Sequence, residues 1–455
     1  MTEDIFLTAQ TPSPQHSEGR VIFIKNCRVI DPGSNRDEIS DILITDGKIA
    51  AIGQNLSASE NAKPKAKSNT EIIDGSGFCV SPGLIDLRTQ AREPGFEHEE
   101  TLTSLANAAS AGGITQLCCL PNTQPIIEDP SMVALIRQKR QPVSPKIHPF
   151  AALSKGLAGQ ELSEMGLLHE AGAIGFTDAP NALSSPLVMR RALSYARFFD
   201  GLVMTHPEEP SLAQGAMNEG AIATEMGLSG RPTLAEIIQV ERDIRLAEAT
   251  QGRLHIGPLT CAGSIEAVRQ AKLRGVKITC DTAPHYYLLN ETAVLGYRTF
   301  AKVAPPLRSE NDRLAVLAGL ADGTIDAVTS DHAPRAADSK RLPFAQAAFG
   351  VVGVETLLPA ILWLAHQKII TLSAALALVT RNPARILRLK PTECEYGLHP
   401  GHPADMVIFN LETSVQIDTD YFKSKSKNSA FDGATMQGRI ERTIIGGQTA
   451  YLRGE

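Results

Sequence analysis

Four polar side chains alternate with apolar ones in the stretch from residue 78 to residue 95. They occupy every second position: Asp86, Arg88, Gln90 and Arg92. Because successive side chains of a β-strand point to opposite faces, these four project to one side. The apolar residues around them predict a buried strand that ends near Glu93-Pro94-Gly95. Such a face is either a solvated strand end or a binding site.

The same stretch resembles the first barrel strand of the dihydroorotases, a family in the amidohydrolase superfamily. The resemblance rests on Pro82-Gly-Leu-Ile-Asp86, followed after a short gap by Arg92-Glu-Pro-Gly95. The family pattern is D-x-H-x-H-x-R, in which both histidines bind zinc and the arginine holds the substrate carboxylate. Here Arg88 and Gln90 stand at the two histidine positions. The resemblance, which extends over nearly all of the chain from Val21 onward, implies the family fold with an altered metal site.

Three further metal-ligand positions of the family are retained in this chain. The resemblance places them at the ends of later strands, at His206, His255 and Asp331. In the family this aspartate is also the general acid/base. A lone histidine after a buried strand is often a structural group. The indication of metal binding therefore comes mainly from the occurrence of two histidines at successive strand ends. After the fourth strand the family commonly has two aspartates, of which the second bridges the metals. This chain keeps the first as Asp178 and has Ala179 in place of the second, although a one-residue shift in alignment would make Asp178 a ligand.

The resemblance also implies a set of residues that binds the substrate carboxylate. Its members are Arg92, Asn122 and His332. Asn122 lies in Pro-Asn-Thr, which is equally good turn chemistry. A guanidinium beside an amide suits a planar carboxylate, which favours the binding role. Two other positions depart from the family: Ala304 replaces an asparagine that contacts the pyrimidine ring, and Tyr286 replaces a histidine.

The charge of Arg88 argues against the family's pair of zinc ions. A catalytic zinc takes three protein ligands and a water, so the retained positions would suffice for at most one zinc. Two cations ~4 Å apart repel by a few kcal/mol at an intermediate dielectric. We therefore expect Arg88 to pair with Asp331 and Asp178 in place of a metal.

Replacement ligands are scarce near the altered positions. The amide oxygen of Gln90 is a poor zinc ligand. Cys118 or Cys119 could supply a thiolate, although only one of two adjacent residues can point into a barrel.

Composition and net charge limit the kinds of partner and the cellular setting that are expected. The chain has 455 residues, a net charge of −6 and a pI near 6.0, which argues against nucleic acid and anionic membranes as partners. Seven cysteines without regular spacing predict a reduced, cytoplasmic setting. The first residues do not resemble a signal peptide, and no apolar run approaches the ~20 residues of a membrane span.

The elements that must position these residues follow a regular order. Residues 77–392 alternate strand and helix patterns in eight units, which predicts a (β/α)₈ barrel of the α/β class with its site at the carboxyl ends of the strands. Residues 20–76 and 393–455 show short strands and turns, and the resemblance implies that they form one small β-sandwich domain. Residues 1–19 are expected to be a flexible tail, and the polar stretch 55–70 a surface insert.

Three functions are consistent with these observations. The first is a catalytically degenerate dihydroorotase homologue of pyrimidine biosynthesis, oligomeric and, as the resemblance implies, a structural partner of aspartate carbamoyltransferase. The second is an active dihydroorotase, or a related cyclic amidohydrolase, on a mononuclear zinc centre; as a dihydroorotase it would hydrolyse dihydroorotate to carbamoyl aspartate. The third is the binding of a small carboxylated pyrimidine precursor.

Overall fold

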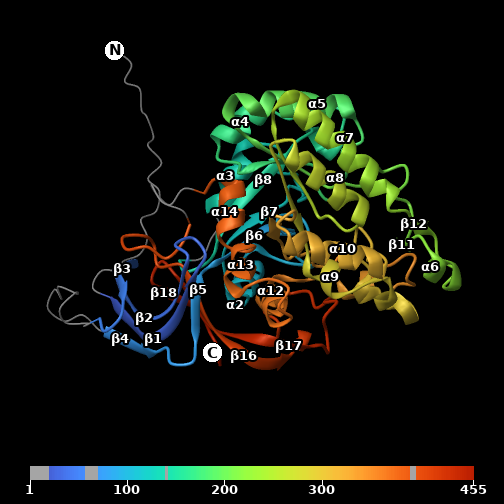
Figure 1. Cartoon of the computed structure of the whole chain (residues 1–455). Coiled ribbons are helices and arrows are strands. Elements are labelled where there is room, and N and C mark those ends of the chain that lie inside the picture. The colour runs from blue at the N-terminus through green and yellow to red at the C-terminus, as the bar shows by residue number, and fades with distance from the viewer. Residues whose placement is uncertain (1–19, 57–69, 139–141, 390–395, 455) are drawn as a thin grey trace, which may run out of the picture.

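The computed structural model describes residues 20–56, 70–138, 142–389 and 396–454 (Figure 1). The expected tail at 1–19 and most of the expected insert, 57–69, lie outside the described residues. Within the described ranges, no helix is both long and apolar enough to span a bilayer.

Eight parallel strands form the barrel, in the order in which they occur along the chain. They are β6 (Leu84–Thr89), β7 (Ile114–Cys119), β8 (Lys146–Ala152), β9 (Gly175–Thr177), β10 (Leu202–Thr205), β13 (Arg253–Ile256), β14 (Ile278–Thr282) and β15 (Ala327–Val328). The gap between the last strand and the first is bridged by the pairing of Thr89 with His332 and by Gln90 N–H, which donates to the His332 carbonyl at 2.9 Å. The expected (β/α)₈ barrel is confirmed.

Helices follow the strands and cover the outside of the barrel (Figure 1). They are α2 (Leu102–Ala111), α3 (Pro130–Gln138), α4 (Met165–Glu170), α5 (Pro186–Ala196), α7 (Leu234–Thr250), α8 (Ala262–Leu273), α10 (Glu310–Ala321) and α12 (Leu357–His366). The connections also contain α6 (Ala221–Glu225), α9 (Pro284–Leu288), α11 (Ala337–Lys340), α13 (Leu372–Ala377) and α14 (Arg381–Leu387). The alternation of strand side chains explains this arrangement: Val203 joins the core shared with α5 and α7, whereas Leu202 and Met204 join a separate core with Phe150 and helix α14.

A second sheet combines both ends of the chain. Its order is β18-β17-β16-β5-β1-β2-β3, with β4 paired to β1. The strands are β1 (Val21–Asp31), β2 (Arg36–Thr45), β3 (Lys48–Gly53), β4 (Thr70–Asp74), β5 (Cys79–Pro82), β16 (Met406–Gln416), β17 (Thr435–Ile445) and β18 (Gln448–Leu452). Figure 1 shows the blue and red strands together on one side of the barrel. The additional domain is thus one continuous sheet, and it extends beyond residue 76 because β5 pairs with β1 and β16.

Candidate functional site at the barrel mouth

Arg88 lies at the carboxyl end of β6 and is only 2% exposed. Its Nε donates to Asp331 Oδ1 at 2.9 Å, its Nη1 to the Gly257 carbonyl at 3.0 Å, and its Nη2 to His206 Nδ1 at 2.9 Å. Gly257 is needed here because a Cβ would stand 2.1 Å from Asp281 Oδ1. Each of the three guanidinium nitrogens therefore donates to an acceptor at a different strand end.

The contact with Arg88 determines the proton position on His206. A guanidinium only donates, so Nδ1 of His206 must accept and Nε2 must carry the proton. Nε2–H then donates to Glu208 Oε2 at 3.2 Å, and Glu208 also pairs with Arg231 Nη1 at 2.7 Å. Burial lowers the pKa of His206. The positive charge of Arg88 lowers it further, whereas the hydrogen bond to Glu208 raises it. The imidazole is thus neutral and fully engaged.

His255 faces a different partner from the other retained positions. Its Nε2 lies 2.9 Å from Asp281 Oδ2, and its Nδ1 lies 2.8 Å from Thr279 Oγ1. Nε2–H donates to the carboxylate, which leaves Nδ1 to accept from the threonine hydroxyl. Both ring nitrogens of His255 therefore contact β14.

Asp331 is the second member of the central ion pair. Its other carboxylate oxygen lies 3.6 Å from His285 Nε2. Burial raises the pKa of Asp331 to about 7, although the charge of Arg88 opposes this shift. Burial also lowers the pKa of His285 to about 3, so this imidazole is neutral and adds no positive charge beside the pair. The expected contact between Arg88 and Asp331 is present.

The expected contact between Arg88 and Asp178 is wrong. Asp178 Oδ1 accepts from the backbone N–H groups of Leu153 and Ser154 at 3.0 and 2.9 Å, and Oδ2 accepts from the Ser154 hydroxyl. The carboxylate is thus fully hydrogen-bonded by the loop that follows β8. Three local donors satisfy it without any contribution from the barrel centre.

The carboxylate-binding set lies on the loops just beyond β6, β7 and β15. Arg92 Nε contacts Glu99 Oε2 at 3.1 Å and the Pro334 carbonyl at 3.2 Å. Its Nη2 is buried and has no hydrogen-bond acceptor among the described residues. Asn122 Nδ2 donates to Gln90 Oε1 at 3.1 Å. An unused guanidinium nitrogen in a buried position leaves this part of the mouth able to receive an anion.

The third member of the set, His332, is held between two groups. Its Nδ1 accepts from the Gly353 N–H at 3.2 Å, so its Nε2 carries the proton. That nitrogen is buried, lies 3.6 Å from Glu100 Oε2 and, like Arg92 Nη2, has no hydrogen-bond acceptor among the described residues. Gln90 connects the set, because its backbone N–H contacts His332 and its side chain contacts Asn122.

The residues at the mouth do not fit a zinc ion in this arrangement. Both nitrogens of His206 and of His255 are occupied, and Asp331 is paired with a fixed cation. In the part of the chain that the structure describes, no three His, Cys, Asp or Glu side chains are grouped so that they could hold a metal. Burial raises the pKa of Cys119 to about 12 and that of Cys118 well above its usual value, so neither is a ready thiolate.

Sequence reasoning missed three residues that complete this network: Glu208, Arg231 and Asp281. Glu208 follows His206 by two residues, a signal that could have been used because a carboxylate so close commonly fixes a histidine tautomer. Asp281 lies within strand β14, two residues after Thr279, which is the strand partner of His255. Nothing in the sequence marks Arg231, which reaches Glu208 from the short strand β12 (Gly230–Arg231).

Comparisons with known proteins agree with the fold and with the family. A family model described as "Dihydro-orotase-like" matches residues 77–262, and one described as "Amidohydrolase family" matches residues 295–451. Proteins named dihydroorotase from Syntrophotalea carbinolica and Geobacter metallireducens are each 41% identical, over 94% and 95% of this chain and 99% and 100% of their own lengths. The solved L-hydantoinase (dihydropyrimidinase) from Arthrobacter aurescens superposes with a TM-score of 0.83 at 23% identity, covering 95% of this chain and 96% of that one. The chain belongs to the dihydroorotase family of the amidohydrolase superfamily.

Proposed function

We propose that this chain is a dihydroorotase homologue of pyrimidine biosynthesis in which Arg88 has taken the electrostatic place of the catalytic metal. In this proposal the chain does not hydrolyse dihydroorotate and acts as a structural partner of aspartate carbamoyltransferase. The single observation that supports it most is the set of three contacts from Arg88 to Asp331, Gly257 and His206.

The energetics of the buried ion pair support the absence of a metal. A zinc ion bound by Asp331 and His206 would have to displace Arg88 from both of them. The guanidinium is always charged, so it would then be either unpaired in a buried site or repelled by the dication. Breaking a buried ion pair by removing one partner typically costs about 3–5 kcal/mol. This cost opposes zinc binding. The absence of histidine ligands at positions 88 and 90 opposes it further.

The partner role is supported by what the altered site leaves intact. The barrel and the additional sheet are complete, and the changes at Arg88 and Gln90 are accommodated by hydrogen bonds. A scaffold that keeps its architecture while its metal ligands are replaced is expected to serve through its surface. The resemblance to dihydroorotases points to aspartate carbamoyltransferase as the protein that this surface contacts.

An active dihydroorotase is the second candidate, and the names of the relatives favour it. Proteins 41% identical over nearly the full length are named dihydroorotase. His206, His255 and Asp331 stand at the strand ends where three ligands of a mononuclear zinc would be needed. For this candidate Arg88 would have to leave the position that it occupies.

Metal analysis of the purified chain, combined with an assay of dihydroorotate hydrolysis, separates the two functions. We expect near-zero zinc and no turnover for the natural chain. A matched variant, Arg88→His with Gln90→His, restores two imidazoles and releases His206 and Asp331, so it is expected to gain zinc of about one ion per chain. Stoichiometric zinc together with turnover in the natural chain would replace the first function by the second.

The partner role has its own test. Mixed with aspartate carbamoyltransferase from the same organism, the chain is expected to co-elute with it in size-exclusion chromatography. The zinc-gaining variant should co-elute equally, because the substitutions lie inside the barrel mouth. Independent elution of the two proteins at micromolar concentration would contradict the partner role and leave the metal result unaffected.

A further inference from the structure

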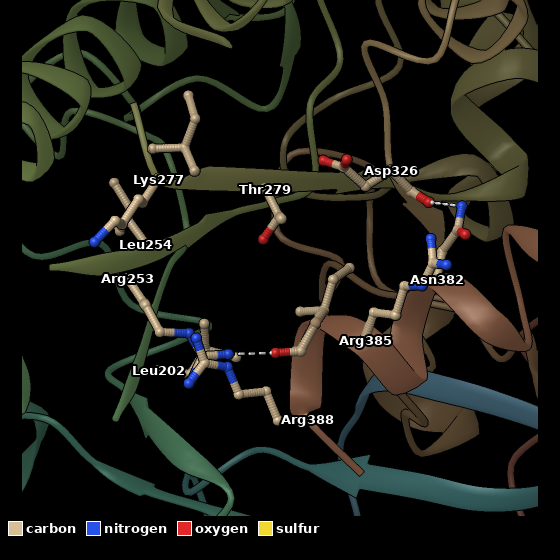
Figure 2. A pocket seen from close by; sticks show the side chains of 11 residues that line it. Leu202, Arg253, Leu254, Lys277, Thr279, Asp326, Asn382, Arg385 and Arg388 are labelled. Atoms are coloured by element: carbon tan, nitrogen blue, oxygen red, sulfur yellow. Dashed lines mark hydrogen bonds between the residues drawn. The ribbon is translucent and has the colours of Figure 1, made fainter. Parts of the chain in front are cut away.

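A cavity of about 510 Å³ lies at the opposite end of the barrel from the mouth (Figure 2). It is formed where strands β10, β13 and β14 begin and where helix α14 crosses beneath them. Cavities of about 300–1,000 Å³ hold small molecules of drug or nucleotide size. The volume is therefore sufficient for a ligand, and the ordinary chemistry of the fold, which takes place at the other end of the strands, does not use it.

The charged side chains that line the cavity are mostly positive. Four cationic side chains border the cavity: Arg253, Lys277, Arg385 and Arg388. The carboxylate among the lining residues is Asp326, which pairs with Lys272 Nζ at 2.6 Å and accepts a hydrogen bond from the Cys280 N–H at 2.8 Å. A concentration of positive charge in a chain whose net charge is −6 creates a local attraction for anions.

Two of the arginines are held in position by the protein. Arg253 donates Nη2 to the Ile386 carbonyl at 2.7 Å and Nη1 to the Asp200 carbonyl at 2.6 Å. Arg388 pairs with the side chain of Asp200. Figure 2 shows these two guanidiniums on one side of the cavity, with Arg385 on helix α14 across from them. Fixed guanidiniums lose little freedom on binding, which favours the recognition of phosphate oxygens.

Lys277 lies on the rim and is exposed. Among the described residues, no carboxylate lies within salt-bridge distance of its ammonium. It can therefore turn toward a bound anion without breaking an ion pair.

The remaining walls are suited to the uncharged part of a ligand. Leu202, Leu254, Ile278 and Ile386 provide apolar surface. Asn382 adds a polar group and is fixed by donating Nδ2 to the Asp326 carbonyl at 2.8 Å, and Thr279 also lines the cavity, with its hydroxyl proton donated to His255. Apolar walls with a few fixed polar groups are typical of small-molecule sites.

We propose that this cavity binds a phosphorylated small molecule of mononucleotide size, with its phosphate at the basic rim and its sugar or ring against the apolar wall. The inference is independent of the proposed function, because it uses neither the metal positions nor a protein partner.

The test is isothermal titration calorimetry of the full-length chain at low ionic strength. The probes are uridine monophosphate, adenosine monophosphate, uridine and inorganic phosphate. Both nucleotides are expected to bind, each more tightly than uridine or inorganic phosphate, because only they use the basic rim and the apolar wall together. Their affinity should fall as salt is added. Equal binding of uridine and uridine monophosphate, or no heat from any nucleotide at millimolar concentration, would overturn the proposal.

Charge reversal locates the binding. Lys277→Glu combined with Arg385→Glu changes two exposed side chains of the lining, and nucleotide affinity should drop by at least about tenfold, because two favourable contacts become repulsive. The matched control is Arg191→Glu, an exposed residue of α5 outside the lining, which should bind as the natural chain does. Thermal melting of each variant shows that it is folded. Unchanged affinity in the folded double variant would place the nucleotide elsewhere and refute this site.

Discussion

The barrel mouth has two halves, a metal half around Arg88 and a carboxylate half around Arg92, which differ in how the buried arginine is hydrogen-bonded. In the metal half, every nitrogen of Arg88 donates to an acceptor from the protein. In the carboxylate half, Arg92 is equally buried, yet its Nη2 has no acceptor among the described residues. Two arginines four residues apart on the same strand and loop thus differ in whether they are satisfied internally.

The difference indicates how each half is used. A buried cation whose donors are all paired is a structural element, and its removal is expected to be costly. A buried cation with an unused donor loses hydrogen-bond energy until a ligand arrives, which favours binding of an anion. Arg88 thus occupies the metal half with all its nitrogens paired, whereas Arg92 in the carboxylate half keeps one donor without an acceptor among the described residues.

The largest effect on stability is expected from Arg88→Met. The substitution keeps an unbranched apolar stem but removes the guanidinium and leaves Asp331 buried without its partner, so the free energy of unfolding should fall by about 3–5 kcal/mol. Urea denaturation followed by circular dichroism measures the change. Gln90→Met on the same segment, which loses one amide contact, serves as the control and should cost about 1 kcal/mol. Equal losses in the two variants would contradict a structural role for the ion pair.

The pH dependence of the same variant sharpens the point. The pKa of Asp331 is raised to about 7, above an unfolded value of about 3.9, so its contribution to stability declines as the pH rises from the unfolded to the folded value. Without Arg88 the folded pKa rises further, and the decline continues at higher pH. The gap in unfolding free energy between wild type and Arg88→Met should therefore widen above pH 7, by up to about 1.4 kcal/mol per pH unit. Parallel curves between pH 6 and 8.5 would show that the charge of Asp331 is not what Arg88 stabilises.

The carboxylate half is probed with Arg92→Lys. Lysine can keep the ion pair with Glu99 but has no second nitrogen in a planar fork, so the binding of dihydroorotate, read from the ligand-induced rise in melting temperature, should weaken about tenfold. Arg335→Lys is the control, because Arg335 contacts the same Glu99 at 3.8 Å. If neither the natural chain nor the control is stabilised by millimolar dihydroorotate, the carboxylate half does not bind this ligand.

The smallest effect is expected from Asn122→Ala. Asn122 is half-buried and makes one contact to Gln90, so its loss should lower the unfolding free energy by about 0.5–1.5 kcal/mol. The stabilisation by dihydroorotate should decrease only a few-fold. A loss of affinity larger than that caused by Arg92→Lys would reverse the assignment of the principal carboxylate ligand.

Much of the fold follows from local sequence patterns. The apolar runs that predicted strands at residues 114–120, 147–153 and 202–204 correspond to β7, β8 and β10, and the helical periodicity of residues 234–249 corresponds to α7. The pairing of Arg88 with Asp331 was also predictable. A barrel brings the ends of its first and last strands together, and a buried guanidinium requires an anion there.

The sequence alone therefore determined the barrel, the order of its strands and the presence of a cation where the family resemblance implies a metal ligand. Only the tertiary structure decided which polar groups satisfy one another. Asp178 accepts from the backbone N–H of Ser154 at 2.9 Å, and His255 lies 2.9 Å from Asp281. The basic cavity likewise depends on where α14 packs under β13 and β14. Hydrogen bonds depend on sub-ångström placement of groups far apart in the chain, which periodicity and residue type do not specify.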